Sequence, residues 1–128
     1  LGMEQQVVVA DDLLVYRMLL RDRAAITDLV EVVLSPLTSA RGGAGPLLDT
    51  LSAYFDSGGN SAETARMMHL SVRAVTYRLQ RIHALTAHDP TRSVDRFTLH
   101  AAVLGARLLG WPPNLPETGK KDPNTRPD

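Results

Sequence analysis

Residues 60–82 read NSAETARMMHLSVRAVTYRLQRI, and this stretch contains two separate signals for the start of a helix. Asn60 begins a capping-box pattern, and Ser71 is a second residue of the type preferred at helix N-caps. We therefore expect a short helix over about 61–68 and a longer one over about 71–85. A connection of about three residues forces two such helices to cross steeply, as in a helix-turn-helix.

The apolar residues of this stretch recur at helical spacings, as a buried seam between crossed helices requires. Ala65 is small enough to let the second helix approach closely. His69 lies where the turn often has a glycine with positive φ, and histidine is among the other residues enriched in that conformation. The seam is predicted to consist of Met68, Leu70, Val75, Leu79 and Ile82.

The outward face of the second helix carries side chains suited to reading DNA. When its apolar residues point inward, the helical repeat leaves a set of polar residues outward. Arginine fits guanine through two hydrogen bonds, glutamine fits adenine in the same way, and a threonine methyl can contact thymine. Two further arginines flank this face toward the phosphates. The predicted DNA-contacting residues are Ser71, Arg73, Thr76, Tyr77, Arg78, Gln80 and Arg81.

Two other interpretations of this helix stay open from the sequence. Its polar residues could be the ordinary solvated face of an amphipathic helix. Alternatively, the helix could dock on a protein, which would make the domain a helical protein-interaction or dimerisation module. Salt separates this alternative from DNA binding, because DNA affinity falls steeply with salt whereas apolar docking responds little.

The distribution of charge favours an anionic partner for the second half of the chain. The formal net charge is zero, with 14 basic and 14 acidic side chains among 128 residues. Residues 1–60 hold four arginines and eight acidic residues, whereas residues 61–107 hold seven arginines and three acidic residues. The net charge is therefore −4 for residues 1–60 and +4 for residues 61–107. The positive potential of the second segment, which contains the helix-turn-helix, attracts anions.

Composition indicates one small domain. A chain of 128 residues with 44% hydrophobic residues can bury a single modest core. It has no cysteine, which excludes disulfide scaffolds and thiolate metal sites and is typical of a reducing compartment. We also recognise neither an apolar run of transmembrane length nor a signal peptide. We therefore expect a soluble, cytoplasmic protein.

The rest of the chain is also predicted to be helical, which gives an all-α fold, a small helical bundle that contains the helix-turn-helix. Periodicity, caps and prolines place further helices at about 12–21, 22–34, 46–56 and 93–109. The last of these has two apolar stripes, so we expect it to be central or pressed against a second chain. The stripes are Val94, Phe97, Ala101, Leu104 and Leu108 on one side, and Leu99, Val103 and Ala106 on the other.

Three regions are expected along the chain. Residues 1–45 are interpreted as N-terminal connecting helices from an upstream domain, and residues 46–110 as the DNA-binding domain. Residues 111–128 hold five of the eight prolines and are predicted to be a disordered tail. The LPETG at 115–119 resembles a sortase signal but lacks the apolar span that should follow it, so we interpret it as coincidental or as an appended ligation handle.

No motif of the chain indicates catalysis. The histidines His69, His83, His88 and His100 fall on different predicted elements, and none is spaced from a carboxylate as in a recognisable metal or catalytic motif. The GGAG at 42–45 follows no predicted strand, so a phosphate-binding loop is not indicated. We expect no enzymatic activity, no cofactor and no metal site.

The stretch LLDTLSAYFDSGGNSAETARMMHLSVRAVTYRLQRI, followed by RFTLHAAVLGARLL, resembles the C-terminal helix-turn-helix domain of the PucR family, the purine catabolism regulator type of bacterial transcription factor. Its helix-turn-helix core also resembles the Fis type. Where the family commonly has HRNT, this chain has SVRA at 71–74, a difference that bears on base contacts and not on the fold. The resemblance covers about 47–109 and rests on Leu51, the GGN turn at 58–60, Thr64 with Ala65, and V-x-YRL-x-x-I at 75–82.

The resemblance implies binding to double-stranded DNA and an upstream sensory domain that takes a small-molecule effector. We also expect a homodimer. The apolar circumference of the helix over 93–109 motivates this expectation, together with the two-fold operators that such modules commonly bind.

Overall fold

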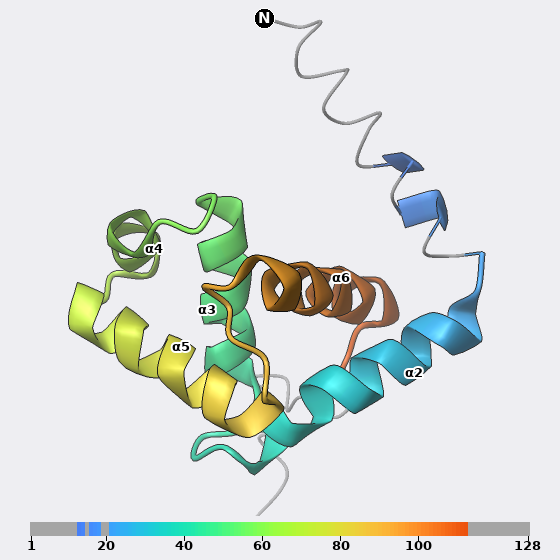
Figure 1. The fold of residues 1–128 in the computed structure, drawn as a ribbon, viewed down its shortest axis with the longest axis horizontal. Coiled ribbons are helices and arrows are strands. Elements are labelled where there is room, and N and C mark those ends of the chain that lie inside the picture. Colours follow the sequence, from blue (N-terminus) through green and yellow to red (C-terminus); the bar gives the residue numbers. More distant parts are fainter. Residues whose placement is uncertain (1–12, 15, 19–20, 113–128) are drawn as a thin grey trace, which may run out of the picture.

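The computed structural model describes residues 13–14, 16–18 and 21–112, and the described part of the chain is all-α (Figure 1). No strand occurs among these residues, which confirms the predicted fold class. The elements are α2 (Arg23–Leu34), the 3-10 helix η1 (Ser35–Ser39), α3 (Gly45–Asp56), α4 (Ser61–Met68), α5 (Val72–Thr86) and α6 (Ser93–Leu109).

The ends of the chain are only partly described. Of the helix predicted over 12–21, residues 13–14 and 16–18 are described and are helical. The remainder of that prediction, and the predicted tail from residue 113 onward, lie outside the described residues.

Local signals set the bounds of α2 and α3. The backbone N–H of Ala25 donates to Oδ1 of Asp22 at 2.9 Å, so Asp22 caps α2, whose predicted range begins at this residue. α2 ends at Leu34, and the chain continues as η1 with Pro36 in its first turn. α3 also has a proline, Pro46, in its first turn, where the missing N–H has no helical partner to lose.

One continuous core joins α2 to the helices that follow it. Val30, Leu51, Ile82 and Leu99 come from α2, α3, α5 and α6, and each is 0% exposed. α2 packs against α6, and the two approach closely at Gly105. The predicted boundary between residues 45 and 46 therefore crosses a shared core. The derivation of residues 1–45 from an upstream domain stays a prediction.

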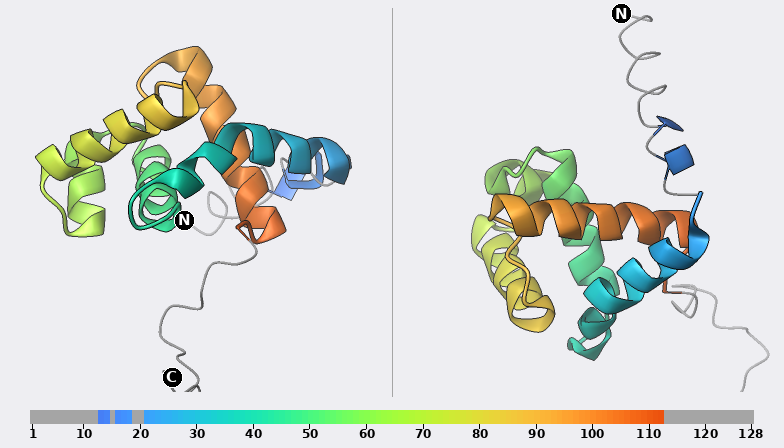
Figure 2. Two further views of the ribbon diagram at one scale, coloured as in Figure 1. Left: turned by 90° about the horizontal axis from the view of Figure 1, so that it is seen from below. Right: turned by 45° about the vertical axis from the view of Figure 1, so that its right-hand side comes forward.

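α6 is packed on one side only. Its inner stripe, which includes Leu99 and Val103, is buried against the domain. On the opposite side Val94 is 78% exposed and Phe97 is 77% exposed. The helix runs across the near side of the domain in the right-hand view of Figure 2. The expectation that α6 might be central is therefore wrong, because its second apolar stripe is exposed at Val94 and Phe97 and only half-buried at Ala101, Leu104 and Leu108.

Trp111 follows α6 and belongs to the folded domain. It is partly buried against the core, and its Nε1–H donates to Oε1 of Glu31 on α2 at 3.0 Å. The sequence places this residue at the start of a disordered tail, but the large indole finds an apolar surface and a hydrogen-bond acceptor within the domain.

Candidate nucleic-acid interface

α4 and α5 form the predicted helix-turn-helix, and they lie on the side of the molecule opposite to the start of α2 (Figures 1 and 2). Oδ1 of Asn60 accepts a hydrogen bond from the N–H of Glu63 at 2.9 Å, which caps α4. The other half of the predicted capping box is absent. The N–H of Asn60 donates to Oγ of Ser57 at 3.1 Å, and the Glu63 carboxylate pairs with Arg66. Ser57 thus takes over the role of the glutamate, because the turn after α3 brings its hydroxyl closer.

The turn between α4 and α5 has the predicted left-handed residue. His69 adopts φ 55° and ψ 42°, and the N–H of Leu70 reaches back to the carbonyl of Ala65 at 2.9 Å. This bond satisfies a carbonyl at the end of α4, as in a Schellman motif. The N–H of Ala74 donates to Oγ of Ser71 at 3.0 Å, so α5 begins at the predicted cap.

The orientation of α5 follows its apolar stripe. Val75, Leu79 and Ile82 are at most 5% exposed and face the core. The side chains predicted to point outward all do so. The exposed residues are Arg73, Thr76, Tyr77 and Gln80, and Ser71 is exposed beside them.

Arg78 was predicted to flank the outward face of α5 and to point toward the phosphates, but its side chain lies partly within the domain. It is half-buried, and its Nη1 donates to Oγ1 of Thr50 at 3.2 Å and to the carbonyl of Pro46 at 3.4 Å. These bonds join α5 to the first turns of α3. Part of the Arg78 guanidinium is therefore committed within the domain and is not free to contact a phosphate.

A pocket of about 340 Å³ opens between α5 and the segment that precedes α3. It brings Arg41, which the sequence leaves in an unremarkable loop, beside Arg78 and Arg81. No local pattern could have identified Arg41, because the contact joins residues that are far apart in the sequence. The pocket is lined by Ala40, Arg41, Pro46, Leu47, Ala74, Tyr77, Arg78 and Arg81.

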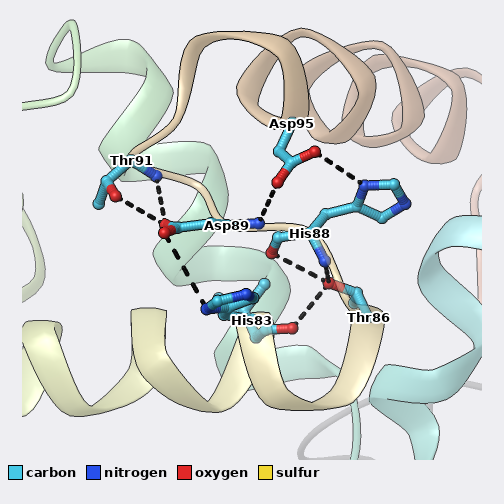
Figure 3. Close-up of polar contacts among 7 residues, drawn as sticks. His83, Thr86, His88, Asp89, Thr91 and Asp95 are labelled. Atoms are coloured by element: carbon cyan, nitrogen blue, oxygen red, sulfur yellow. Dashed lines mark hydrogen bonds and ion pairs between the residues drawn. The ribbon is translucent and has the colours of Figure 1, made fainter.

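Two histidine–carboxylate pairs lie at the corner between α5 and α6 (Figure 3). Nδ1 of His88 is 3.5 Å from Oδ1 of Asp95, and Nδ1 of His83 is 4.0 Å from Oδ2 of Asp89. The sequence did not reveal these pairs, because the loop that joins the helices brings them together. The described residues contain no group of three or more potential metal ligands from histidine, aspartate and glutamate.

The carboxyl groups of this corner stabilise the loop. The N–H of Asp89 donates to Oδ2 of Asp95 at 3.0 Å, and this bond, together with His88, lowers the pKa of Asp95. The hydroxyl and the N–H of Thr91 both donate to Oδ1 of Asp89, and they lower the pKa of that carboxyl group. Both carboxylates therefore serve as acceptors for the chain turn, and neither has the raised pKa typical of a catalytic acid.

Burial against neighbouring helices also affects His100. Its ring stacks on Phe55 with the centroids 4.7 Å apart. Desolvation by burial, assisted by the Arg107 guanidinium, lowers the pKa of His100. The stacked ring thus packs α6 against α3.

The match with known proteins falls on this part of the molecule. Residues 47–104 match the profile of the PucR C-terminal helix-turn-helix domain. These residues are a PucR-type helix-turn-helix domain. The matched region begins in α3, contains α4 and α5, and ends within α6, so it leaves α2 outside although α2 completes the core. Helix-turn-helix regulator domains of this class are typically not enzymes.

The curated relatives of this chain align with more of it than the PucR-type match covers. Uncharacterized proteins of Mycobacterium bovis and Mycobacterium tuberculosis are each 39% identical to this chain over 102 residues. The alignment covers 79% of this chain and 24% of theirs, so the chain spans about a quarter of the curated relatives it matches. No solved structure shows significant similarity. None of the described helices is long and apolar enough to cross a bilayer.

Proposed function

We propose that this chain is the DNA-binding part of a bacterial transcriptional regulator that acts in the cytoplasm, and that α5 lies in the major groove. The observation that carries the proposal is the exposed polar face of α5, which is set on a buried stripe within a PucR-type domain. A major groove admits an α-helix, and the exposed side chains include donors and acceptors that match base edges. The alternative, a helical protein-interaction module, would use the same face without any need for arginine.

The position of each residue along α5 suggests its task. Arg73 lies in the first turn and is exposed, so it would enter the groove first and contact a guanine. Thr76 and Gln80 continue the same face toward further bases. Arg81 lies later and to one side, where the groove curves away and the phosphates are nearer. Ser71 and Tyr77 would add contacts at the edges of this face.

Two substitutions on α5 test the orientation. A preferred duplex is first selected from a randomised library with the 128-residue chain. Arg73→Ala should then cost about 1–3 kcal/mol of binding free energy on the selected duplex and much less on random duplexes. Arg81→Ala should weaken binding to both duplexes about equally and lower the slope of log K against log salt by about one.

Arg23→Ala is the matched control, because Arg23 is an exposed arginine at the start of α2, away from α5. It should leave both affinities unchanged. An unchanged ratio between selected and random duplexes in Arg73→Ala would show that α5 is turned differently in the groove. A wild-type chain that binds no duplex at low salt would favour the protein-interaction module.

We also propose that the DNA-bound form is a homodimer that pairs through the outer face of α6. The residues of the outer stripe, exposed at Val94 and Phe97 and half-buried beyond them, alternate at spacings of three and four, which is the spacing of the contact positions in paired helices. The stripe holds no charged residue, so a second copy of itself is a chemically matched partner. One pair of helices gives an interface near the lower limit for specific complexes, about 1,200 Å², so the free dimer should be weak. The stripe is Val94, Phe97, Ala101, Leu104 and Leu108.

Analytical ultracentrifugation of the chain, alone and with the selected duplex, tests the dimer. Val94→Glu should prevent two copies from binding one duplex, because it would place two carboxylates in the interface. Val32→Glu is the matched control, because Val32 is a valine of nearly equal exposure on α2, 77% against 78%. Loss of the second copy in both variants, or in neither, would exclude pairing through this face.

The small-molecule effector is proposed to bind a domain outside this chain. This proposal rests on the resemblance to PucR-type regulators and on the 24% coverage of the relatives. An effector identified for the longer protein should therefore leave the melting temperature of the 128-residue chain unchanged. A direct shift of that temperature would place the effector site within the 128-residue chain.

A further inference from the structure

The arginine pocket beside α5 has an unusual charge environment. Arg41, Arg78 and Arg81 line it, and no carboxylate is among its lining residues. Within the described part of the chain, none of these three arginines forms an ion pair with an aspartate or glutamate. Three guanidinium groups around one pocket repel one another, and an anion between them would relieve that repulsion.

The three arginines are not equivalent. Nη1 of Arg78 donates to Thr50 and to the carbonyl of Pro46, so this side chain fastens α5 to α3. Arg41 is exposed and Arg81 is half-buried, and neither makes a side-chain hydrogen bond to another described residue. Their donors are therefore available to a ligand. A guanidinium presents paired N–H groups that match the oxygen atoms of a phosphate.

The pocket lies next to the face of α5 that is proposed to read bases. Tyr77 belongs to both, since it is one of the exposed outward residues and also lines the pocket. A helix in the major groove is bordered by the two phosphate backbones. The side of α5 that bears Arg81, together with the segment before α3 that bears Arg41, would then face one of those backbones.

We propose that this pocket binds a backbone phosphate of the DNA, and that Arg41 and Arg81 hold it from two different elements. This inference rests on the proposed function and adds to it a contact from outside the helix-turn-helix. Arg41 precedes the PucR-type match at residue 47, so the phosphate contact belongs to the part of the chain that the domain match leaves out. The same chemistry could take a free phosphate compound, and the test separates the two sources.

The first arm of the test is the salt dependence of binding to selected and random duplexes. Arg41→Ala should raise the Kd several-fold on both duplexes, keep their ratio constant and lower the salt slope by about one. Arg41→Lys should keep the slope, because the charge remains, and recover part of the affinity. Arg23→Ala should match the wild type. An unchanged salt slope in Arg41→Ala, with wild-type binding intact, overturns this inference and leaves the proposed function standing.

The second arm replaces single backbone phosphates of the selected duplex with neutral methylphosphonates. At one position the replacement should weaken the wild type but not Arg41→Ala, and Arg81→Ala should identify the same phosphate. The inference is overturned if no methylphosphonate position weakens the wild type without also weakening Arg41→Ala. If the pocket instead binds a free phosphate compound, pyrophosphate at constant ionic strength should shift the arginine Nε–Hε NMR signals. The salt slopes of Arg41→Ala and Arg81→Ala should then equal that of the wild type. That result also overturns the inference that the pocket binds a DNA phosphate. Absence of any DNA binding by the wild type counts against the proposed function itself.

Discussion

Among the described residues, two that are not glycine end helices in the left-handed conformation. His69 ends α4, and Ala87 ends α5 with φ 62° and ψ 13°. The position of His69 could be predicted because the turn of a helix-turn-helix calls for such a residue. Alanine carries no such signal, so the conformation of Ala87 appears only in the folded chain. An L side chain in this region costs about 1–2 kcal/mol, which a glycine would avoid.

Ala87→Gly should therefore stabilise the protein by about 1 kcal/mol, since the gain at positive φ exceeds the extra entropy that glycine loses on folding. Urea denaturation monitored by circular dichroism measures the effect. Ala84→Gly, at an exposed position inside α5, is the control and should destabilise by about 1 kcal/mol. Equal losses in the two variants would contradict the proposed strain at Ala87.

Single side chains also mark the limit of what the sequence could predict for the site. The outward set on α5 follows from the helical repeat once the apolar stripe is known, and all four outward residues are exposed. Arg78 departs from its prediction because α3, an element distant in the sequence, offers Thr50 and the Pro46 carbonyl as acceptors. Arg41 was missed for the same reason, since its neighbours are set by packing and not by local spacing.

At the scale of elements, the contact between α2 and α6 depends on the absence of a side chain at Gly105. A Cβ there would lie 2.8 Å from Cγ2 of Ile26 and 3.0 Å from Cγ2 of Val30. Both neighbours are buried β-branched residues, which have few rotamers with which to give way. The helices would have to move apart to accommodate any larger residue.

Gly105→Ala should lower the free energy of unfolding, because the overpacking cost of about 1–3 kcal/mol outweighs the gain in helix propensity of about 1 kcal/mol. A double-mutant cycle with Ile26→Ala provides the check. In that background the same substitution should cost at least about 1 kcal/mol less, because the methyl group in its way is gone. If the two substitutions had additive effects on the free energy of unfolding, a side chain at position 105 would not contact Ile26.

The corner between α5 and α6 makes stability depend on pH (Figure 3). The pKa values of Asp89 and Asp95 are lowered from 3.8 in the folded protein, so the unfolded chain binds these protons more readily. The stabilisation is present above that value and is lost as the pH falls through the lowered folded pKa values. Asp95→Asn removes one carboxylate and should lower the melting temperature near neutral pH.

The difference in melting temperature between the wild type and Asp95→Asn should shrink as the solution is acidified below pH 3.8. Thermal melts between neutral pH and strong acid measure it. Asp28→Asn, an exposed carboxylate on α2 with no side-chain hydrogen bond or ion pair to another described residue, should show no such trend. A difference that stays constant in acid would remove the electrostatic explanation.

The bounds of these elements could be predicted well, whereas their arrangement could not. Caps and prolines act within a few residues, so Asp22, Asn60 and Ser71 each start a helix as expected. The packing of α2 on α6 joins segments about seventy residues apart, and no local rule reports it. The sequence therefore suggested a domain boundary at residue 45, which the shared core crosses.

At the scale of the whole molecule, the folding unit should include α2. A fragment of residues 46–112 contains the PucR-type match but would expose the surface of α6 that α2 covers, including Gly105 where Ile26 and Val30 approach it. We expect this fragment to lose the cooperative thermal transition that a fragment of residues 21–112 retains. Circular dichroism melts of the two fragments decide the matter. A cooperative transition of the shorter fragment at the same temperature would show that α2 is an accessory.

Trp111 lies where α6 ends against α2, and it is the only tryptophan of the chain. Its indole is partly buried and hydrogen-bonded to Glu31, so its fluorescence is sensitive to this contact. Separation of α2 from α6 would expose the indole to water and shift its emission to longer wavelengths. The contact joins α2 to the end of α6, so a ligand that binds α5 without separating these two helices should leave the emission wavelength unchanged. The native chain thus carries a built-in optical probe that reports the contact between α2 and the end of α6.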